Sequence, residues 1–163
     1  MSRKPIDPKI KLSFAIIAMV LISTVDAVRA QNTPSPIFGD VTVRPKFSEP
    51  LTVRGMSGGS VSGNQVAGRS DTATGPCTGF VDEKPDHSIV LTSKFDYLKL
   101  QVQSPEDTTI IVKGPGGTWC NDEFDQKNPG IVGEWLPGNY NVWVGSYKKN
   151  QYLPYTLQIT EVK

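Results

Sequence analysis

Residues 107–147 read DTTIIVKGPGGTWCNDEFDQKNPGIVGEWLPGNYNVWVGSY. Short runs in which apolar and polar residues alternate are separated by the turn sequences Gly-Pro-Gly-Gly, Asn-Pro-Gly and Pro-Gly-Asn. Alternation predicts strands, because successive side chains of a strand point to opposite faces of a sheet, and Gly and Pro favour tight turns. The stretch therefore predicts consecutive strands joined by short connections in an all-β domain.

Further strands are predicted on both sides of this stretch, because turn signals recur roughly every eight to twelve residues. The predicted strands cover residues 40–44, 51–54, 88–93, 97–103, 108–113, 131–136, 140–147 and 152–160. The Gly-rich residues 55–68 are interpreted as another strand rather than a flexible linker. No ten-residue window after residue 30 has helical periodicity, so the profile predicts an antiparallel β-sandwich.

The first thirty residues have the plan of a secretory signal peptide. A basic segment precedes the apolar run 12–22, which is too short to span a bilayer comfortably, and Val28-Arg29-Ala30 provides a cleavage site before Gln31. An uncleaved membrane anchor is the alternative, although Asp26 and Arg29 argue against it. The predicted organisation is a signal peptide over 1–30, a flexible lead over 31–38 and a single β-sandwich domain over 39–163.

The charge of the mature chain excludes one class of partner. Cleavage after Ala30 removes five of the 17 basic and two of the 16 acidic residues, which leaves a slight excess of acidic groups. A nucleic-acid-binding surface needs a cluster of basic side chains, so no nucleic acid is expected as a partner. We expect a secreted or periplasmic protein with no stable membrane span once the signal is removed.

Both cysteines, Cys77 and Cys120, lie in the mature part of the chain. Two cysteines in an exported protein most simply form a disulfide. Free or metal-binding thiols are the alternative, but two cysteines and the single His87 make a poor zinc site, since structural zinc takes four ligands.

The order of motifs resembles that of a known family. An Asp-Thr-Thr strand, Gly-Pro-Gly-Gly, Trp-Cys-Asn-Asp-Glu, Pro-Gly-Ile, Pro-Gly-Asn-Tyr and Val-Trp-Val-Gly-Ser-Tyr follow one another between about residues 86 and 160. This arrangement resembles the bacterial pre-peptidase C-terminal (PPC) domains, in the form of a standalone secreted member. The resemblance implies a jelly-roll-like β-sandwich that acts as a non-catalytic binding or accessory module. The cysteine pair departs from the family, of which it is not a general feature.

The resemblance also implies a calcium site, since some relatives bind calcium through acidic loops. The candidate ligands are Asp107, Asn121, Asp122, Glu123 and Asp125. Calcium takes six to eight oxygen ligands, which carboxylates, amides and carbonyls provide. The alternative is a solvated acidic turn. A second acidic group, Asp82, Glu83 and Asp86, is interpreted as an exposed loop.

Catalytic residues are not expected. Gly55-Met56-Ser57-Gly58-Gly59 matches the letters of a nucleophile elbow, but that motif needs a following helix, and none is predicted. His87 is the single candidate base and is interpreted as a turn or capping residue. A carboxylate pair for glycoside hydrolysis stays open, because the separation of the acidic groups in space cannot be read from the sequence.

The aromatic residues of the last third are candidates for ligand binding. Alternation along residues 140–147 places Trp143 and Tyr147 on the face opposite Val142 and Val144. If the valines belong to the core, Trp143 and Tyr147 form an exposed recognition patch, because aromatic faces bind sugars and peptides. The alternative is that these aromatics are partly core, as we expect for Trp135 and Tyr140.

Three classes of function follow from these observations. The first is a non-catalytic binding or accessory module, stabilised by calcium, that recognises an extracellular protein or polysaccharide. The second is a structural envelope or surface-associated component without a discrete ligand. An enzyme or peptidase inhibitor is the least favoured class.

Overall fold

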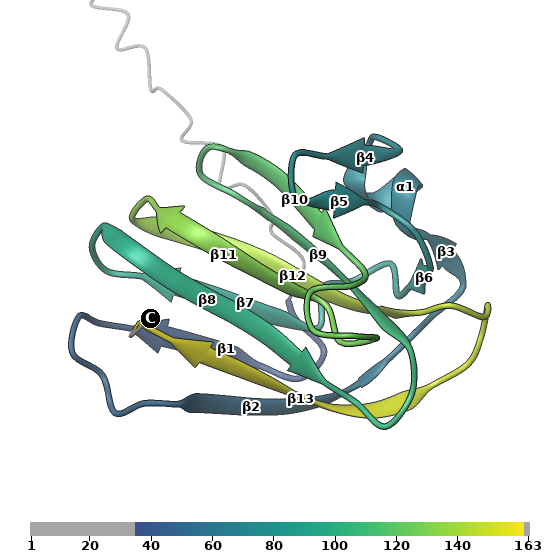
Figure 1. Ribbon diagram of the computed structural model, residues 1–163, viewed down its shortest axis with the longest axis horizontal. Coiled ribbons are helices and arrows are strands. Elements are labelled where there is room, and N and C mark those ends of the chain that lie inside the picture. The colour runs from purple at the N-terminus through teal and green to yellow at the C-terminus, as the bar shows by residue number, and fades with distance from the viewer. Residues whose placement is uncertain (1–34, 162–163) are drawn as a thin grey trace, which may run out of the picture. The chain divides into compact units, whose positions relative to one another are not determined.

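Strands supply nearly all of the regular structure in residues 35–161, the part that the computed structural model describes (Figure 1). They form two sheets that pack face to face and a small two-stranded ribbon. The all-β sandwich predicted from the sequence is therefore confirmed. The predicted signal peptide, residues 1–30, lies outside the described residues.

The larger sheet, here called sheet A, has five strands side by side and a short extension. In spatial order the five are β1 (Asp40–Val43), β7 (His87–Leu91), β12 (Gly138–Ser146), β9 (Thr108–Gly114) and β10 (Gly117–Asn121). The extension consists of β6 (Phe80–Val81), which pairs with the last residue of β12, and β3 (Val61–Ser62), which pairs with β6.

The second sheet, sheet B, is antiparallel throughout. Its order is β11 (Gly130–Trp135), β8 (Phe95–Gln103), β13 (Leu153–Thr160) and β2 (Leu51–Ser57). Sheet A departs from the predicted antiparallel pattern at one place, because β1 runs parallel to β7. The chain continues from β1 into β2 of the other sheet, so no hairpin joins β1 to β7. A parallel pairing of β1 with β7 is therefore possible.

The core lies between the two sheets and follows the alternation of the strands. Side chains from the inner faces of both sheets are fully buried, among them Val142, Val144, Leu100 and Leu157. Trp135 and Tyr140 also belong to this core, as predicted, with ring centroids 5.0 Å apart. Burial of this apolar surface, at about 25 cal/mol per Å², is the main stabilising contribution to the sandwich.

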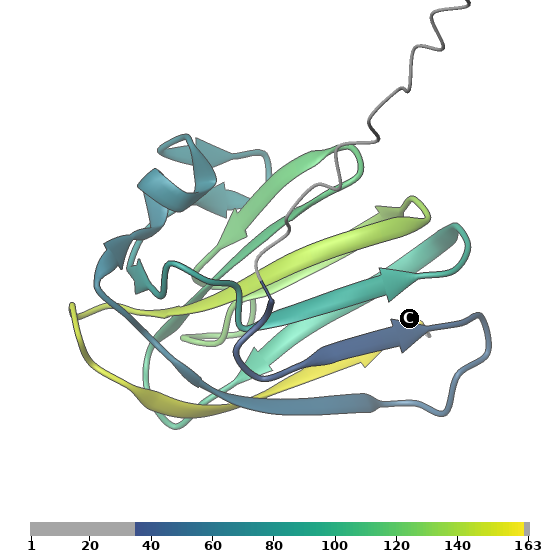
Figure 2. The same ribbon diagram turned by 180° about the vertical axis from the view of Figure 1, so that it is seen from behind.

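A third layer covers part of the outer face of sheet A. Residues 58–81, here called the cover segment, contain β3, the short helix α1 (Gly63–Ala67), β4 (Asp71–Thr72), β5 (Gly75–Pro76) and β6. The sequence predicted a single strand over residues 55–68. That prediction is wrong, because β2 ends at Ser57 and the short helix α1 contains Val66. Figures 1 and 2 place α1, β4 and β5 beside the edge strand β10.

The cover segment encloses a second, smaller core. Its buried members from sheet A are Ile111, Trp143 and Cys120, and Cys77, Ala67 and Val81 come from the cover segment. The predicted disulfide between Cys77 and Cys120 is present, with the two Cα atoms 5.0 Å apart.

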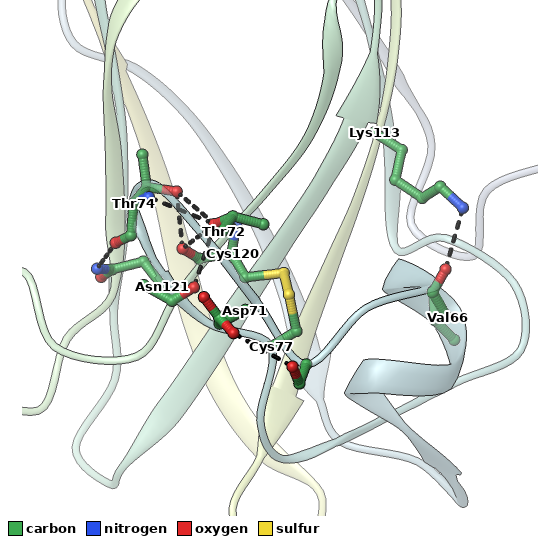
Figure 3. Close-up of a disulfide and its surroundings, with 10 residues drawn as sticks. Val66, Asp71, Thr72, Thr74, Cys77, Lys113, Cys120 and Asn121 are labelled. Carbon is green, nitrogen blue, oxygen red and sulfur yellow. Dashed lines mark hydrogen bonds between the residues drawn. A yellow bond between two sulfur atoms is a disulfide. The ribbon is translucent and has the colours of Figure 1, made fainter.

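Hydrogen bonds attach the same layer to the edge strand β10 (Figure 3). Thr72 Oγ1 accepts from the Cys120 N–H at 3.0 Å, and Thr74 Oγ1 donates to the Cys120 carbonyl at 2.8 Å. The strand β10 is an edge of sheet A and has backbone groups without a partner strand. Threonine side chains thus provide hydrogen-bond partners for some of these groups.

No helix within residues 35–161 is long and apolar enough to cross a membrane.

Candidate functional site

The part of the outer face of sheet A that the cover segment leaves uncovered carries a regular arrangement of polar side chains. Register places Asp40, Ser88 and Asn141 opposite one another in one row across β1, β7 and β12. The next row consists of Thr42, Val90 and Asn139. These six residues are here called the open face, and their strands β1, β7 and β12 lie side by side in Figure 2.

The open face is hollowed. The six residues, together with Ser35 and Pro36, line a shallow depression of about 360 Å³. Adjacent strands lie about 4.8 Å apart, and residues two positions apart on a strand are separated by about 6.8 Å. The rows therefore span an area that matches one or two pyranose rings.

Hydrogen-bonding groups of both kinds remain available on this surface. Ser88 Oγ donates to Asn139 Oδ1 at 2.7 Å, which orients the amide of Asn139 and leaves both Nδ2 hydrogens without an intramolecular acceptor among the described residues. Within residues 35–161, the side chains of Asp40, Thr42 and Asn141 make no hydrogen bond or ion pair. The surface thus offers a carboxylate acceptor at β1 and amide donors at β12, with Val90, 36% exposed, between them.

A different polar group is buried at the beginning of β7. Asp86 is fully buried, and its Oδ2 accepts a hydrogen bond from the Val144 N–H at 2.6 Å. Its Oδ1 has no partner among the described residues. Burial raises the pKa of this carboxyl to about 8, and the charge of Asp82 adds to the rise, while the Val144 hydrogen bond opposes it. The prediction that Asp86 belongs to an exposed loop is wrong, because its backbone pairs with β12 and draws the side chain inward.

His87, the next residue, is buried as well. Its Nε2 lies 2.8 Å from the Tyr155 hydroxyl, and its ring hydrogen-bonds the Gly39 carbonyl. Burial lowers the pKa of His87 to about 4, so the ring is neutral near pH 7 and Nε2 accepts the proton of the Tyr155 hydroxyl. His87 therefore links β7 to β13 of the other sheet and is not the turn or capping residue that the sequence suggested.

Ser57, the serine of the elbow-like sequence, and His87, the candidate base, do not form a hydrogen-bonded pair. Ser57 is the last residue of β2, is fully buried, and lies 2.8 Å from Ser146 Oγ. His87 is hydrogen-bonded to Tyr155 and Gly39 instead. Neither side chain is exposed to solvent.

Trp143 and Tyr147, which were predicted to form an exposed patch, differ in their exposure to solvent. Val142 and Val144 are in the core, as the prediction required, and Trp143 does lie on the opposite face. Trp143 is nevertheless only 7% exposed, because the cover segment packs over it. Tyr147 alone is exposed, at 47%, and its hydroxyl lies 3.4 Å from Asp122 Oδ2. The prediction of a Trp143–Tyr147 surface patch is therefore wrong for Trp143.

The candidate calcium ligands are spread over the connection before β9, the last residue of β10 and the connection after β10. Asp107 and Asp122 interact electrostatically, and burial together with the charge of Asp122 raises the pKa of Asp107. Asn121 holds backbone groups, since its Oδ1 accepts from the Gly130 N–H and its Nδ2 donates to the Thr74 carbonyl. Glu123 and Asp125 are exposed in the connection between β10 and β11.

The described residues contain no group of three or more His, Cys, Asp or Glu side chains placed to hold a metal ion. Asp107 Oδ1 is the one orphaned buried carboxylate oxygen of this region, since the described residues give it no partner. The five residues therefore do not form one ligand set, although Asp107 and Asp122 interact electrostatically. Calcium itself stays a prediction.

Fold and open face define the chain as a β-sandwich module with one disulfide and a polar hollow on one outer face. No protein-family model matches the chain. It is 25% identical over 153 residues to an uncharacterized protein of Synechococcus elongatus, which covers 91% of this chain and 92% of that protein.

Two solved structures are similar in fold. The pre-peptidase C-terminal domain of a collagenase from Bacillus anthracis has a TM-score of 0.44 at 12% identity, covering 79% of this chain and 99% of that domain. PliG, a periplasmic inhibitor of g-type lysozyme from Aeromonas hydrophila, has a TM-score of 0.38 at 14% identity, covering 75% of this chain and 97% of that protein. The first is a domain of the family that the sequence resembles.

Sequence reasoning did not find the open face. Alternation within residues 40–44 and 140–147 indicates which side chains share a face of one strand. It does not indicate that β1, β7 and β12 are neighbours, since these strands are far apart in the chain. The register between them exists only in the folded sheet.

Proposed function

We propose that this protein is an exported, non-catalytic binding module that recognises a polysaccharide through the open face. The observation that carries the proposal is the alignment of Asp40, Ser88 and Asn141 with Thr42, Val90 and Asn139 in two rows around one hollow. The disulfide supports a location outside the cytosol, where such bonds persist.

The chemistry of the open face suits hydroxyl groups. A sugar hydroxyl donates one hydrogen bond and accepts others, so it is best bound between a fixed acceptor and a fixed donor. Asp40 provides the acceptor and the Asn139 amide, oriented by Ser88, provides the donor. Val90 gives the apolar contact that the carbon face of a pyranose needs.

The same features fit a polymer better than a small free sugar. The hollow is open to solvent and does not enclose a ligand. A few exposed hydrogen bonds contribute about 0.5 to 1.5 kcal/mol each, so one or two sugar units bind weakly. A polymer compensates for this because it presents many such units to the same hollow.

The test is isothermal titration of the mature protein with neutral hexasaccharides of glucose, xylose and N-acetylglucosamine. At least one is expected to bind, and Asp40→Ala and Asn139→Ala are each expected to weaken that binding roughly threefold to tenfold, as loss of one or two such hydrogen bonds implies. Thr52→Ala, at an exposed position of β2 in sheet B that lines neither hollow, is the matched control and should bind like the wild type. Absence of binding to every hexasaccharide at millimolar concentration, or equal binding by all variants, would overturn the proposal.

A further inference from the structure

A second hollow lies on the outer face of sheet B, away from the open face. Register places Arg54 of β2, Thr156 of β13 and Gln103 of β8 opposite one another in a single row. The three residues alternate with core-facing residues of their strands, the partly buried Val53 and the buried Tyr155 and Val102, and so point away from the core. Together with Pro105, Pro154, Gly55 and Tyr155, they line a depression of about 370 Å³.

Among the described residues, Arg54 is the only charged one that lines this depression. Within residues 35–161 the salt bridges involve Lys94 with Asp96 and Glu134, and the Arg54 guanidinium has no acidic partner. A guanidinium carries five N–H donors in a planar fork that fits a carboxylate with two parallel hydrogen bonds. Arg54 therefore presents an unsatisfied carboxylate-binding group at the rim of a preformed hollow.

The neighbours of Arg54 are held in place. Gln103 and Gln158 exchange amide hydrogen bonds in both directions, at 3.2 and 3.3 Å. Ser104 Oγ donates to the Pro154 carbonyl at 3.1 Å, which joins the connection after β8 to β13 next to the hollow. Gln103 and Pro154, which line the hollow, are thus held in position before any ligand binds. This reduces the conformational entropy that binding costs.

We propose that this hollow binds a uronic acid unit of an acidic polysaccharide. The Arg54 guanidinium pairs with the sugar carboxylate, and the Thr156 hydroxyl hydrogen-bonds a ring hydroxyl. The pyrrolidine rings of Pro105 and Pro154 pack against the carbon face of the pyranose. The subsite is independent of the open face, because it lies on the other sheet.

The experiment titrates the mature protein with tri-galacturonate, with neutral tri-galactose and with an acetylated peptide that ends in a free carboxylate. Tri-galacturonate is expected to bind, and Arg54→Gln is expected to weaken that binding at least tenfold. Lys99→Gln removes the same charge from the same face outside the hollow and should change the affinity less than twofold. This control separates recognition by Arg54 from general attraction of anions.

Three results would overturn the proposal. The first is absence of binding to tri-galacturonate at millimolar concentration, and the second is an equal loss of affinity in Arg54→Gln and Lys99→Gln. The third is Arg54-dependent binding of the peptide in place of the sugar acid. If the Arg54 proposal fails, the expected effects of Asp40→Ala and Asn139→Ala on the binding of neutral hexasaccharides do not change. The two proposals can therefore fail independently.

Discussion

Asp86 and His87 are neighbours in sequence whose proton equilibria shift in opposite directions on folding. The pKa of Asp86 rises from 3.8 to about 8 because of burial, so the folded state holds one proton more than the unfolded state between those values. The pKa of His87 falls from 6.5 to about 4, so there the unfolded state holds the extra proton. The two effects oppose each other between about pH 4 and 6.5, and only the Asp86 effect remains above pH 6.5.

From this difference we predict that the free energy of unfolding falls as the pH rises from 6.5 to 8, at up to about 1.4 kcal/mol per pH unit. Asp86→Asn is expected to abolish the fall, because an amide carries no ionisable proton and can still accept from the Val144 N–H. Urea unfolding at several pH values measures it. Asp71→Asn, at an exposed acidic residue, should keep the wild-type profile, and a flat wild-type profile would contradict the prediction.

At the scale of single residues, the sequence predicted some burial states correctly and others wrongly. The assignment of Trp135 and Tyr140 to the core was correct, since alternation along their own strands determines it. Asp86 was misassigned, because its burial depends on pairing with β12, more than fifty residues away. Pairing with a distant strand decides such positions, and the residues around Asp86 do not indicate which strand that is.

At the scale of elements, the strands were largely predictable and the cover segment was not. Each of the eight predicted strand segments coincides with an observed strand, within a few residues at the ends. The strands β3, β4, β5 and β6 were missed because two-residue strands leave no periodic signal. The edge strand β10 was missed as well, because its first residue belongs to the Gly-Pro-Gly-Gly sequence that was interpreted as a turn. The third layer that β3, β4, β5 and β6 build is the reason that Trp143 is buried instead of exposed.

The disulfide should matter chiefly for this layer. It closes a separation of 43 residues in sequence, for which chain entropy predicts a stabilisation of at most about 4 kcal/mol. We expect Cys77→Ala/Cys120→Ala to lower the free energy of unfolding by roughly 2 to 4 kcal/mol, as measured by urea unfolding. Hydrogen exchange should show loss of protection in residues 58–81 first, while the strands β8 and β13 stay protected. Unchanged stability would contradict this role.

Calcium is predicted to act on the connection that contains Asp122. A cation between Asp107 and Asp122 would relieve the repulsion that contributes to the raised pKa of Asp107. Calcium at ten times its dissociation constant would add about 1.4 kcal/mol, a rise of a few degrees in melting temperature. Thermal unfolding in 10 mM calcium against chelator measures it, with Asp107→Asn as the variant expected to lose the response. The same melting temperature in both conditions would contradict calcium binding between Asp107 and Asp122.

At the scale of the whole molecule, the arrangement separates a stabilising interior from two polar outer surfaces. The sandwich core and the cover segment bury most of the large apolar side chains. The open face and the Arg54 hollow lie on the outer faces of sheets A and B, where pairing across three strands aligns their side chains. The fold class followed from turn spacing and alternation, but both surfaces depend on strand order, which the sequence alone did not provide.

The most direct test of the central claim is a titration followed by two-dimensional ¹H–¹⁵N NMR, with the neutral hexasaccharide that binds most tightly. The account predicts saturable shifts in the backbone amides of residues 40, 42, 88, 90, 139 and 141, and in the side-chain amides of Asn139 and Asn141. Resonances of β8 and β13 should stay in place. Shifts confined to other parts of the molecule, or no saturable shift with any hexasaccharide, would contradict the claim that the open face is the binding surface.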